Sequence, residues 1–256
     1  MDIVNMKTTL ALSMATLLIS SSAFAADFSA TKDKLETALA ADIRTDKEVA
    51  RDRNRKPVRT LEFFGFRDDM KVVELMPGGG WYTKLLAPVV ADKGQYYMAI
   101  GTSRASKAVA GQAGFDKVKV TAEEAKIYRP EGSKFYALEA DGLGVSDMDM
   151  VLTFRNYHNF SESGRAVMNK MAFDALKSGG VYAVVDHTRR HMQATDNENR
   201  RRFDPVLAIK EIQAAGFKFV DMTDLHYKPD DELRYEVGRK SVTGNSDRWT
   251  LKFVKP

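Results

Sequence analysis

The chain has 256 residues, 44% hydrophobic and 29% charged, which is typical of a globular protein and excludes wholesale disorder, a collagen-like repeat and a coiled coil. Its 39 basic and 35 acidic side chains leave a net charge of +4, too mild to predict a nucleic-acid partner. The absence of cysteine excludes a disulfide framework, a thiolate nucleophile and a cysteine-bound metal.

Residues 1–25 have the pattern of a secretory signal peptide. Lys7 supplies a positive charge, residues 10–19 form an apolar run, and Ala23-Phe24-Ala25 is a small-residue cleavage site. The run is too short to span a bilayer, which takes about 20 residues. We therefore expect the protein to be exported, to the periplasm, with no membrane insertion after the signal peptide is cleaved.

Residues 26–66 are expected to form an N-terminal helical extension. Leu35, Leu39 and Ile43 recur at helical spacing and predict one apolar stripe over residues 31–50. A further helix should end at Gly65. The basic stretch between them, residues 51–56, is interpreted as a solvated turn or helix end.

Residues 67–256 alternate short apolar runs with helical segments. This alternation predicts an α/β domain with a doubly wound, mostly parallel sheet, whose ligands bind beyond the carboxyl ends of the strands. One helix should cover about residues 162–177, ended by Gly179 and Gly180, and another should begin at Asp204 and Pro205. Residues 102–130 are less regular, with helical patterns around 104–110 and 121–127. We expect strands at residues 71–76, 95–100, 134–140, 149–154, 181–186, 217–225 and 248–254.

The sharpest motif is the turn at residues 74–80, Glu-Leu-Met-Pro-Gly-Gly-Gly, which follows a strand and begins a helix. Glycines let the main chain turn tightly and approach a ligand, and the helix amino terminus can face an anionic group. Alternatively, the glycines only permit close packing of strand and helix. A dinucleotide-binding turn would have glycine three residues after Gly80. Because Thr83 stands there, a nicotinamide cofactor is disfavoured.

The turn resembles the acidic-x-G-x-G-x-G motif of class I S-adenosylmethionine-dependent methyltransferases. Glu74, Gly78 and Gly80 match its acidic residue and its second and third glycines, whereas Met76 replaces the first. The resemblance implies a Rossmann-like sheet of seven strands with an antiparallel closing strand, S-adenosylmethionine as cofactor, and an unidentified small molecule as substrate. Over about residues 48–256 the chain is similar to a group of predicted bacterial methyltransferases with signal peptides, through residues 51–57, 63–65, 72–88, 155–159, 186–187, 214–217 and 251–256.

The same resemblance assigns residues to cofactor binding. Methyltransferases usually end the second strand with a carboxylate that holds the ribose, but residues 99–102 here read Ala-Ile-Gly-Thr. Thr102, or Ser103 beside it, is then expected to donate a weaker hydrogen bond. Asp141 is expected near the adenine, with a helix N-cap as its equally weighted alternative. The full set of expected cofactor-binding residues is Glu74, Pro77, Gly78, Gly79, Gly80, Thr102, Asp141 and Asn156.

Polar residues at two expected strand ends are the candidates for catalysis. Asn156, Tyr157 and His158 follow the fourth strand, and Asp186 and His187 end the fifth. His158 is the expected base, because an imidazole titrates near about pH 6.5, while Asp186 or His187 would orient it or the acceptor.

The remaining histidines and basic residues have plainer interpretations. A metal held by Asp186, His187 and His191 is disfavoured, because the spacing matches no recognised zinc pattern. His226 is interpreted as a surface residue of a loop. The run at residues 200–202 is either a solvated approach to a helix or a site for an anionic substrate.

Two other classes of function stay open. A non-catalytic exported ligand-binding protein on the same fold is favoured by the missing ribose carboxylate and by Met76, and a nicotinamide oxidoreductase ranks third. The sequence does not name the methyl acceptor, the atom methylated, the source of cofactor outside the cytosol or the oligomeric state.

Overall fold

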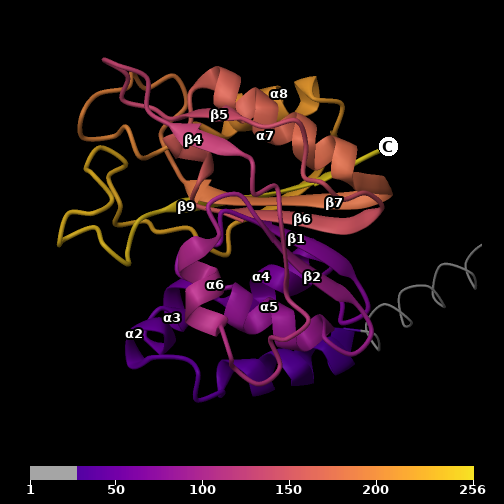
Figure 1. Ribbon diagram of the computed structural model, residues 1–256. Coiled ribbons are helices and arrows are strands. Elements are labelled where there is room, and N and C mark those ends of the chain that lie inside the picture. Colours follow the sequence, from indigo (N-terminus) through magenta and orange to yellow (C-terminus); the bar gives the residue numbers. More distant parts are fainter. Residues whose placement is uncertain (1–27) are drawn as a thin grey trace, which may run out of the picture.

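A computed structural model describes residues 28–256, so the predicted signal peptide lies outside the described residues. A seven-stranded sheet lies between two layers of helices (Figure 1). One strand is antiparallel to both of its neighbours and the others are parallel, which confirms the predicted doubly wound, Rossmann-like sheet. The spatial order is β3 (Lys119–Thr121), β2 (Gln95–Ala99), β1 (Lys71–Leu75), β6 (Met148–Phe154), β7 (Leu176–His187), β9 (Arg248–Val254) and β8 (Lys218–Thr223), with β9 the antiparallel strand.

The first helical layer, below the sheet in Figure 1, includes the N-terminal part of the chain. Leu35, Leu61 and Phe64 are fully buried and belong to the same core as Val72 of β1. The expected helical extension is therefore packed as part of the domain core. The helices of this layer are residues 28–39, α2 (Asp46–Val49), α3 (Asp52–Arg55), α4 (Pro57–Phe64), α5 (Thr83–Val90) and α6 (Ser103–Val109).

The second layer contains α7 (Glu162–Ala175) and α8 (Pro205–Ala214). The short 3-10 helix η1 (Tyr157–Asn159) joins β6 to α7, and α8 follows β7. Asp204 caps α8 as predicted, because its side chain accepts a hydrogen bond from Val206 N at 2.9 Å. A two-stranded antiparallel sheet, β4 (Lys126–Tyr128) and β5 (Ala137–Glu139), lies on the same side (Figure 1). Within residues 28–256, no helix has the length and apolar character needed to cross a membrane.

Two predictions about residues 102–140 are wrong. Residues 137–139 form β5, which pairs with β4 instead of joining the main sheet, and the third strand of that sheet is β3. Residues 121–127 are not helical but contain the end of β3, a turn and the start of β4. β3 has three residues at the sheet edge, all exposed or half-buried, so its sequence shows no apolar alternation.

The helical stripe predicted over residues 31–50 is broken into two helices. Arg44 Nη1 donates to the carbonyl of Leu39 at 2.7 Å, where the first helix ends. Thr45 and Glu48 then form a capping box, in which Thr45 N donates to Glu48 Oε2 at 2.8 Å, and this starts α2. Near residue 177 the chain also departs from expectation: α7 ends at Ala175, and Gly179 and Gly180 lie within β7.

Candidate functional site

The glycine turn and the residues after β6 meet at the carboxyl edge of the sheet. The chain order reverses at β1, which has β2 on one side and β6 on the other, and ligands of doubly wound sheets bind at such a point. Asn156 Nδ2 donates to the main-chain carbonyls of Leu75 and Met76, both at 3.3 Å. The structure thus brings together two segments that the sequence assigns to one site.

The turn itself leaves open space beside two of its glycines. A Cβ atom placed on Gly78 or Gly79 would meet no other atom within 4 Å, whereas one on Gly80 would meet Ala105 of α6 at 3.5 Å. The carbonyl of Pro77 accepts a hydrogen bond from Gly80 N at 3.0 Å and closes the turn. Since 3.5 Å is an ordinary van der Waals contact, close packing does not require any of the three glycines, and Gly78 and Gly79 are free to border a ligand.

Met76 occupies the place of the first motif glycine with a left-handed backbone, at φ 51°. Its N–H donates to the carbonyl of Ala99 at 2.9 Å and ties the turn to the end of β2. A left-handed residue with a side chain costs roughly 1–2 kcal/mol. Met76 therefore keeps the backbone conformation of the turn but lowers the stability of the folded protein.

Glu74 lies beneath the turn, with 3% of its surface exposed. Its Oε2 accepts hydrogen bonds from Thr83 Oγ1 at 2.9 Å and from the Tyr96 hydroxyl. Burial raises the pKa of Glu74 to about 7, against the hydrogen bonds from Tyr96 and Thr83 and the nearby positive charge of Arg55. The carboxyl group joins β1, α5 and β2 and so supports the turn from below.

Thr102 follows β2, and Asp141 follows β5. Thr102 is half-buried between β2 and α6. Asp141 is exposed and precedes a segment held at the end of β3, because Thr121 Oγ1 donates to the carbonyl of Leu143. No helix follows Asp141, since residues 141–147 lead into β6, so the N-cap interpretation is wrong.

Two exposed carboxylates at this edge, Glu123 and Glu124, were not identified from the sequence. They follow β3, the strand that the sequence did not reveal. Had β3 been recognised, their position after a strand of the main sheet would have marked them as candidates for cofactor contact.

Asp186 links the ends of β6 and β7. The carboxylate is fully buried; Oδ1 accepts from His158 Nδ1 at 2.6 Å and from His187 N at 2.6 Å, and Oδ2 accepts from His158 N at 2.8 Å. His158 is 4% exposed. Since Nδ1 of His158 is engaged by Asp186, the ring nitrogen left for proton transfer is Nε2.

The ring of His187 lies 5.6 Å from that of His158, and its Nδ1 contacts Ser246 Oγ at 2.9 Å. Burial, reinforced by the positive charges around it, holds the pKa of His187 well below its usual value. Its imidazole is therefore neutral at physiological pH and can act as a proton acceptor or a hydrogen-bond partner.

Tyr157, also a predicted catalytic residue, points into the core. It is fully buried, its hydroxyl donates to Glu211 Oε2 at 2.9 Å, and it receives a hydrogen bond from Asn169 at 2.9 Å. Its ring packs edge-on against Phe203 and Trp249. These contacts hold α7 and α8 on the sheet and do not place the hydroxyl at the glycine turn.

His226 is buried, in contrast to the predicted surface position. It is 2% exposed, with Nδ1 2.7 Å from Thr250 Oγ1 and Nε2 3.0 Å from the carbonyl of Arg55. Burial lowers the pKa of His226 to about 4. The histidine therefore anchors α3 to β9.

The basic stretch at residues 51–56 is not a solvated turn throughout. Arg55 is 7% exposed, and its guanidinium lies 4.2 Å from the centre of the Trp81 ring. It lines a cavity of about 340 Å³ at the carboxyl edge together with His187, Arg155 and Arg248. The local sequence does not indicate this burial, because the residues that cover Arg55 are distant in the chain, Trp81, Tyr82 and His226 among them.

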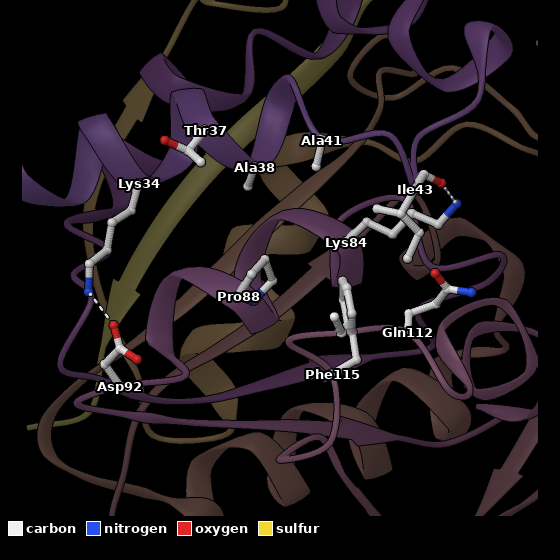
Figure 2. A pocket seen from close by; sticks show the side chains of 11 residues that line it. Lys34, Thr37, Ala38, Ala41, Ile43, Lys84, Pro88, Asp92, Gln112 and Phe115 are labelled. Carbon is white, nitrogen blue, oxygen red and sulfur yellow. Dashed lines mark hydrogen bonds and ion pairs between the residues drawn. The ribbon is translucent and has the colours of Figure 1, made fainter.

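A second cavity, of about 390 Å³, lies on the helical face of the domain (Figure 2). It is formed by the N-terminal helix, α5 and Phe115, and is bordered by the Lys34–Asp92 ion pair at 3.5 Å. The cavity runs along α5 from Lys84 to Asp92, but none of residues 74–80 lines it, so it is separate from the glycine turn.

The two histidines considered as metal ligands, His187 and His191, have other partners in the structure. His191 Nδ1 pairs with Asp204 Oδ2 at 2.9 Å, away from His187. In the part of the chain that the structure describes, no group of three or more histidine, aspartate or glutamate side chains could hold a metal ion.

No protein-family profile matches this sequence, and no curated protein matches it either. Solved structures do match. A SAM-dependent methyltransferase from Aquifex aeolicus shares 14% identity over 81% of this chain and 93% of its own, with a TM-score of 0.57. The [4+2]-cyclase SpnF shares 14% identity over 85% of both chains, with a TM-score of 0.54.

A third match is a chain in the complex between the Haloferax volcanii Trm112 methyltransferase activator and a methyltransferase. It shares 12% identity over 88% of this chain and 97% of its own, with a TM-score of 0.51. At such identities the likeness concerns the fold. The chain has the Rossmann-like fold of S-adenosylmethionine-dependent methyltransferases, and its activity has to be argued from its own residues.

Proposed function

We propose that the protein is an S-adenosylmethionine-dependent methyltransferase that acts on a small molecule. The observation that carries this proposal is the turn at Gly78 and Gly79, which borders open space at the point where the sheet order reverses. Asn156 fixes the turn from the neighbouring strand end through its bonds to Leu75 and Met76.

The residues around the turn suit an S-adenosyl cofactor. Main-chain groups of residues 77–80 would hold it, Thr102 would contact the ribose, and Asp141 would contact the adenine. The bound cofactor supplies an electrophilic methyl group on a sulfonium. Correct positioning of the acceptor can supply much of the rate of such a transfer, so few side chains need to take part in the chemistry.

Proton removal from the acceptor falls to one of two histidines. His158 has Nε2 free and is oriented by Asp186, while His187 lines the cavity and is kept neutral by burial. We assign the base to His158, with His187 as a hydrogen-bond partner of the acceptor. His158→Ala and His187→Ala should both retain cofactor binding, and only the former should remove the base.

A non-catalytic ligand-binding protein is the second candidate. One observation favours it: β2 is followed by Ile100 and Gly101, both with positive φ, and then by Thr102, so no carboxylate stands at the expected ribose contact. The [4+2]-cyclase SpnF shows that a protein of this fold can carry another activity.

Thermal unfolding of the mature chain with S-adenosylmethionine, S-adenosylhomocysteine or NAD separates these functions. Ligands that bind only the folded state raise the midpoint by mass action. We expect S-adenosylmethionine and S-adenosylhomocysteine to raise the midpoint and NAD to leave it unchanged. We also expect a turnover assay with S-adenosylmethionine to detect methyl transfer. A rise without turnover would support the binding protein, and a rise with NAD alone would support an oxidoreductase.

Export is part of the proposal and rests on residues 1–25. Mass spectrometry of the protein isolated from fractionated cells should find a periplasmic chain that starts at Ala26. A cytosolic chain that starts at Met1 or Met6 would contradict export and would remove the question of how cofactor reaches the enzyme.

A further inference from the structure

The cavity of about 340 Å³ at the carboxyl edge is lined by six arginines and by no aspartate or glutamate. They converge from separate parts of the chain: α3 and its N-cap, the turn after β6, the segment before α8, and the start of β9. His187 and Ser246 form a further part of its wall. The arginines are Arg51, Arg53, Arg55, Arg155, Arg201 and Arg248.

Within residues 28–256, five of these six arginines form no ion pair with an aspartate or glutamate. Arg201 is different, because its Nη2 pairs with Glu236 Oε2 at 2.8 Å. The side chain of Arg155 makes neither a hydrogen bond nor an ion pair, and that of Arg55 lies over the rings of Trp81 and Tyr82. Arg248, 6% exposed, donates Nη1 to the carbonyl of Asn54 at 2.8 Å, and its Nε is buried without a partner.

The electrostatic consequence is a desolvated cluster of like charges. Burial, together with repulsion from Arg155, lowers the pKa of Arg55 to about 9 and that of Arg248 to about 10, although Asp247 favours the charged form of Arg248. Arg248 adds to the repulsion at Arg55. Asp186 lies near enough to favour the charged forms of Arg155 and Arg248, but it already accepts three hydrogen bonds. Buried charges are normally paired, so this cluster is arranged to receive an anion.

The cavity borders the proposed methyl-transfer site. Arg55 lies over Trp81, which follows Gly80 directly. Arg155 directly precedes Asn156, which bonds to the end of β1, and its left-handed backbone (φ 62°) is tied to β7 through Arg155 N and the carbonyl of Val185 at 2.7 Å. The walls of the cavity are thus joined to the residue that follows the glycine turn, by contact with Trp81, and to Asn156, by adjacency in the chain.

We infer that this cavity binds the anionic end, a carboxylate or a phosphate, of the methyl acceptor. The inference rests on the proposed function only in naming the occupant as the acceptor. Guanidinium groups recognise both oxyanions through paired N–H donors. The volume is at the lower end of the range for small-molecule sites, about 300–1,000 Å³, so the acceptor is small.

The test uses inorganic phosphate and malonate as probes of the two oxyanions. Each is titrated into the mature wild-type protein, Arg155→Gln and Arg59→Gln at constant ionic strength, with the thermal midpoint as readout. Arg155→Gln should fold normally, because its guanidinium makes no hydrogen bond that would be lost. Arg59 is exposed, belongs to α4 and does not line the cavity, so its variant controls for net charge.

We expect at least one probe to raise the midpoint of wild type and Arg59→Gln alike, with an affinity at least about tenfold weaker in Arg155→Gln. We also expect Arg155→Gln without added anion to unfold no earlier than wild type, since a desolvated charge is removed. No effect of either probe on wild type, or equal effects on Arg155→Gln, would overturn the inference.

A titration with S-adenosylhomocysteine separates the acceptor from the cofactor, which has a carboxylate of its own. We expect Arg155→Gln to keep the wild-type affinity for S-adenosylhomocysteine, and phosphate to bind alongside it. Competition between the two, or an equal loss of both affinities, would show that the arginines hold the cofactor and would overturn the acceptor site. Phosphate binding without S-adenosylhomocysteine binding would overturn the proposed function and leave an anion site of another kind.

Discussion

The carboxylate of Asp186 holds His158 at two points, accepting from the ring Nδ1 at 2.6 Å and from the main-chain N–H at 2.8 Å. Because Asp186 is near the end of β7 and His158 follows β6, the contact fixes two neighbouring strand ends relative to each other. A third donor, His187 N, reaches the same carboxylate. The geometry of the site's histidines therefore depends on one buried side chain.

Removing this carboxylate should cost much stability. Asp186→Ala leaves three buried donors without a partner, and each such loss costs about 1–3 kcal/mol, so we expect a decrease of about 3 kcal/mol or more in the free energy of unfolding. Urea titration measures it. Asp174→Ala is the control, because Asp174 forms only an exposed pair with Lys170 and should change stability by less than about 0.5 kcal/mol. Similar losses in both variants would contradict this role of Asp186.

Glu74 predicts a pH dependence of stability. Its pKa is about 7 in the folded protein against an ordinary 4.5, so the folded state holds a proton that the unfolded state has released. Stability from this group is full below about pH 4.5 and is lost as the pH rises through about 7, by about 3 kcal/mol. Glu74→Gln cannot titrate, so its stability relative to wild type should rise between pH 5 and pH 8. A constant difference across this range would show that the carboxyl group is not buried as described.

His226 should change the pH dependence of stability in the opposite direction to Glu74. Its pKa is about 4 in the folded protein against an ordinary 6.5. Stability from the neutral ring is full above about pH 6.5 and is lost as the pH falls towards 4, by about 3 kcal/mol. The stability of wild type relative to His226→Gln should therefore decline on acidification from pH 7 to pH 4. If the two proteins decline in parallel, His226 is solvated in solution.

Sequence patterns located the glycine turn and the central strands well, for local reasons. Residues 248–254 alternate polar or charged side chains with apolar ones, a pattern typical of a strand, and they form β9. Asp204 and Pro205 begin a helix, because capping involves only nearby residues. Gly78 and Gly80 have positive φ, a conformation that a run of glycines predicts directly. Each of these features is determined within a few residues of the chain.

What the sequence did not reveal depends on contacts between distant segments. Arg55 and His226 are polar residues in polar stretches, and they are buried because they contact each other across a separation of 171 residues. Tyr157 follows a strand like its neighbours, but its side chain faces the second helical layer. The arginine cavity could not be predicted, because its walls come from segments with no shared pattern.

A conservative substitution at Gly79 separates ligand approach from folding. Gly79 has no positive φ and its Cβ would meet no atom within 4 Å, so Gly79→Ala should leave the thermal midpoint unchanged. The added methyl group would nevertheless occupy the space beside the turn. We expect weaker protection of the variant by S-adenosylhomocysteine, and unaltered protection would place the ligand elsewhere.

The most direct test of the central claim is calorimetric titration of S-adenosylhomocysteine into wild type, Gly78→Ala and Gly179→Ala. Both glycines have positive φ, 62° and 80°, and both Cβ atoms would enter open space, so the two variants carry comparable backbone strain. Gly179 lies at the amino end of β7, at the opposite edge of the sheet. We predict that wild type and Gly179→Ala bind equally and that Gly78→Ala binds at least about tenfold more weakly; an absence of binding to wild type, or equal binding by all three proteins, would contradict the proposal that the glycine turn holds an S-adenosyl cofactor.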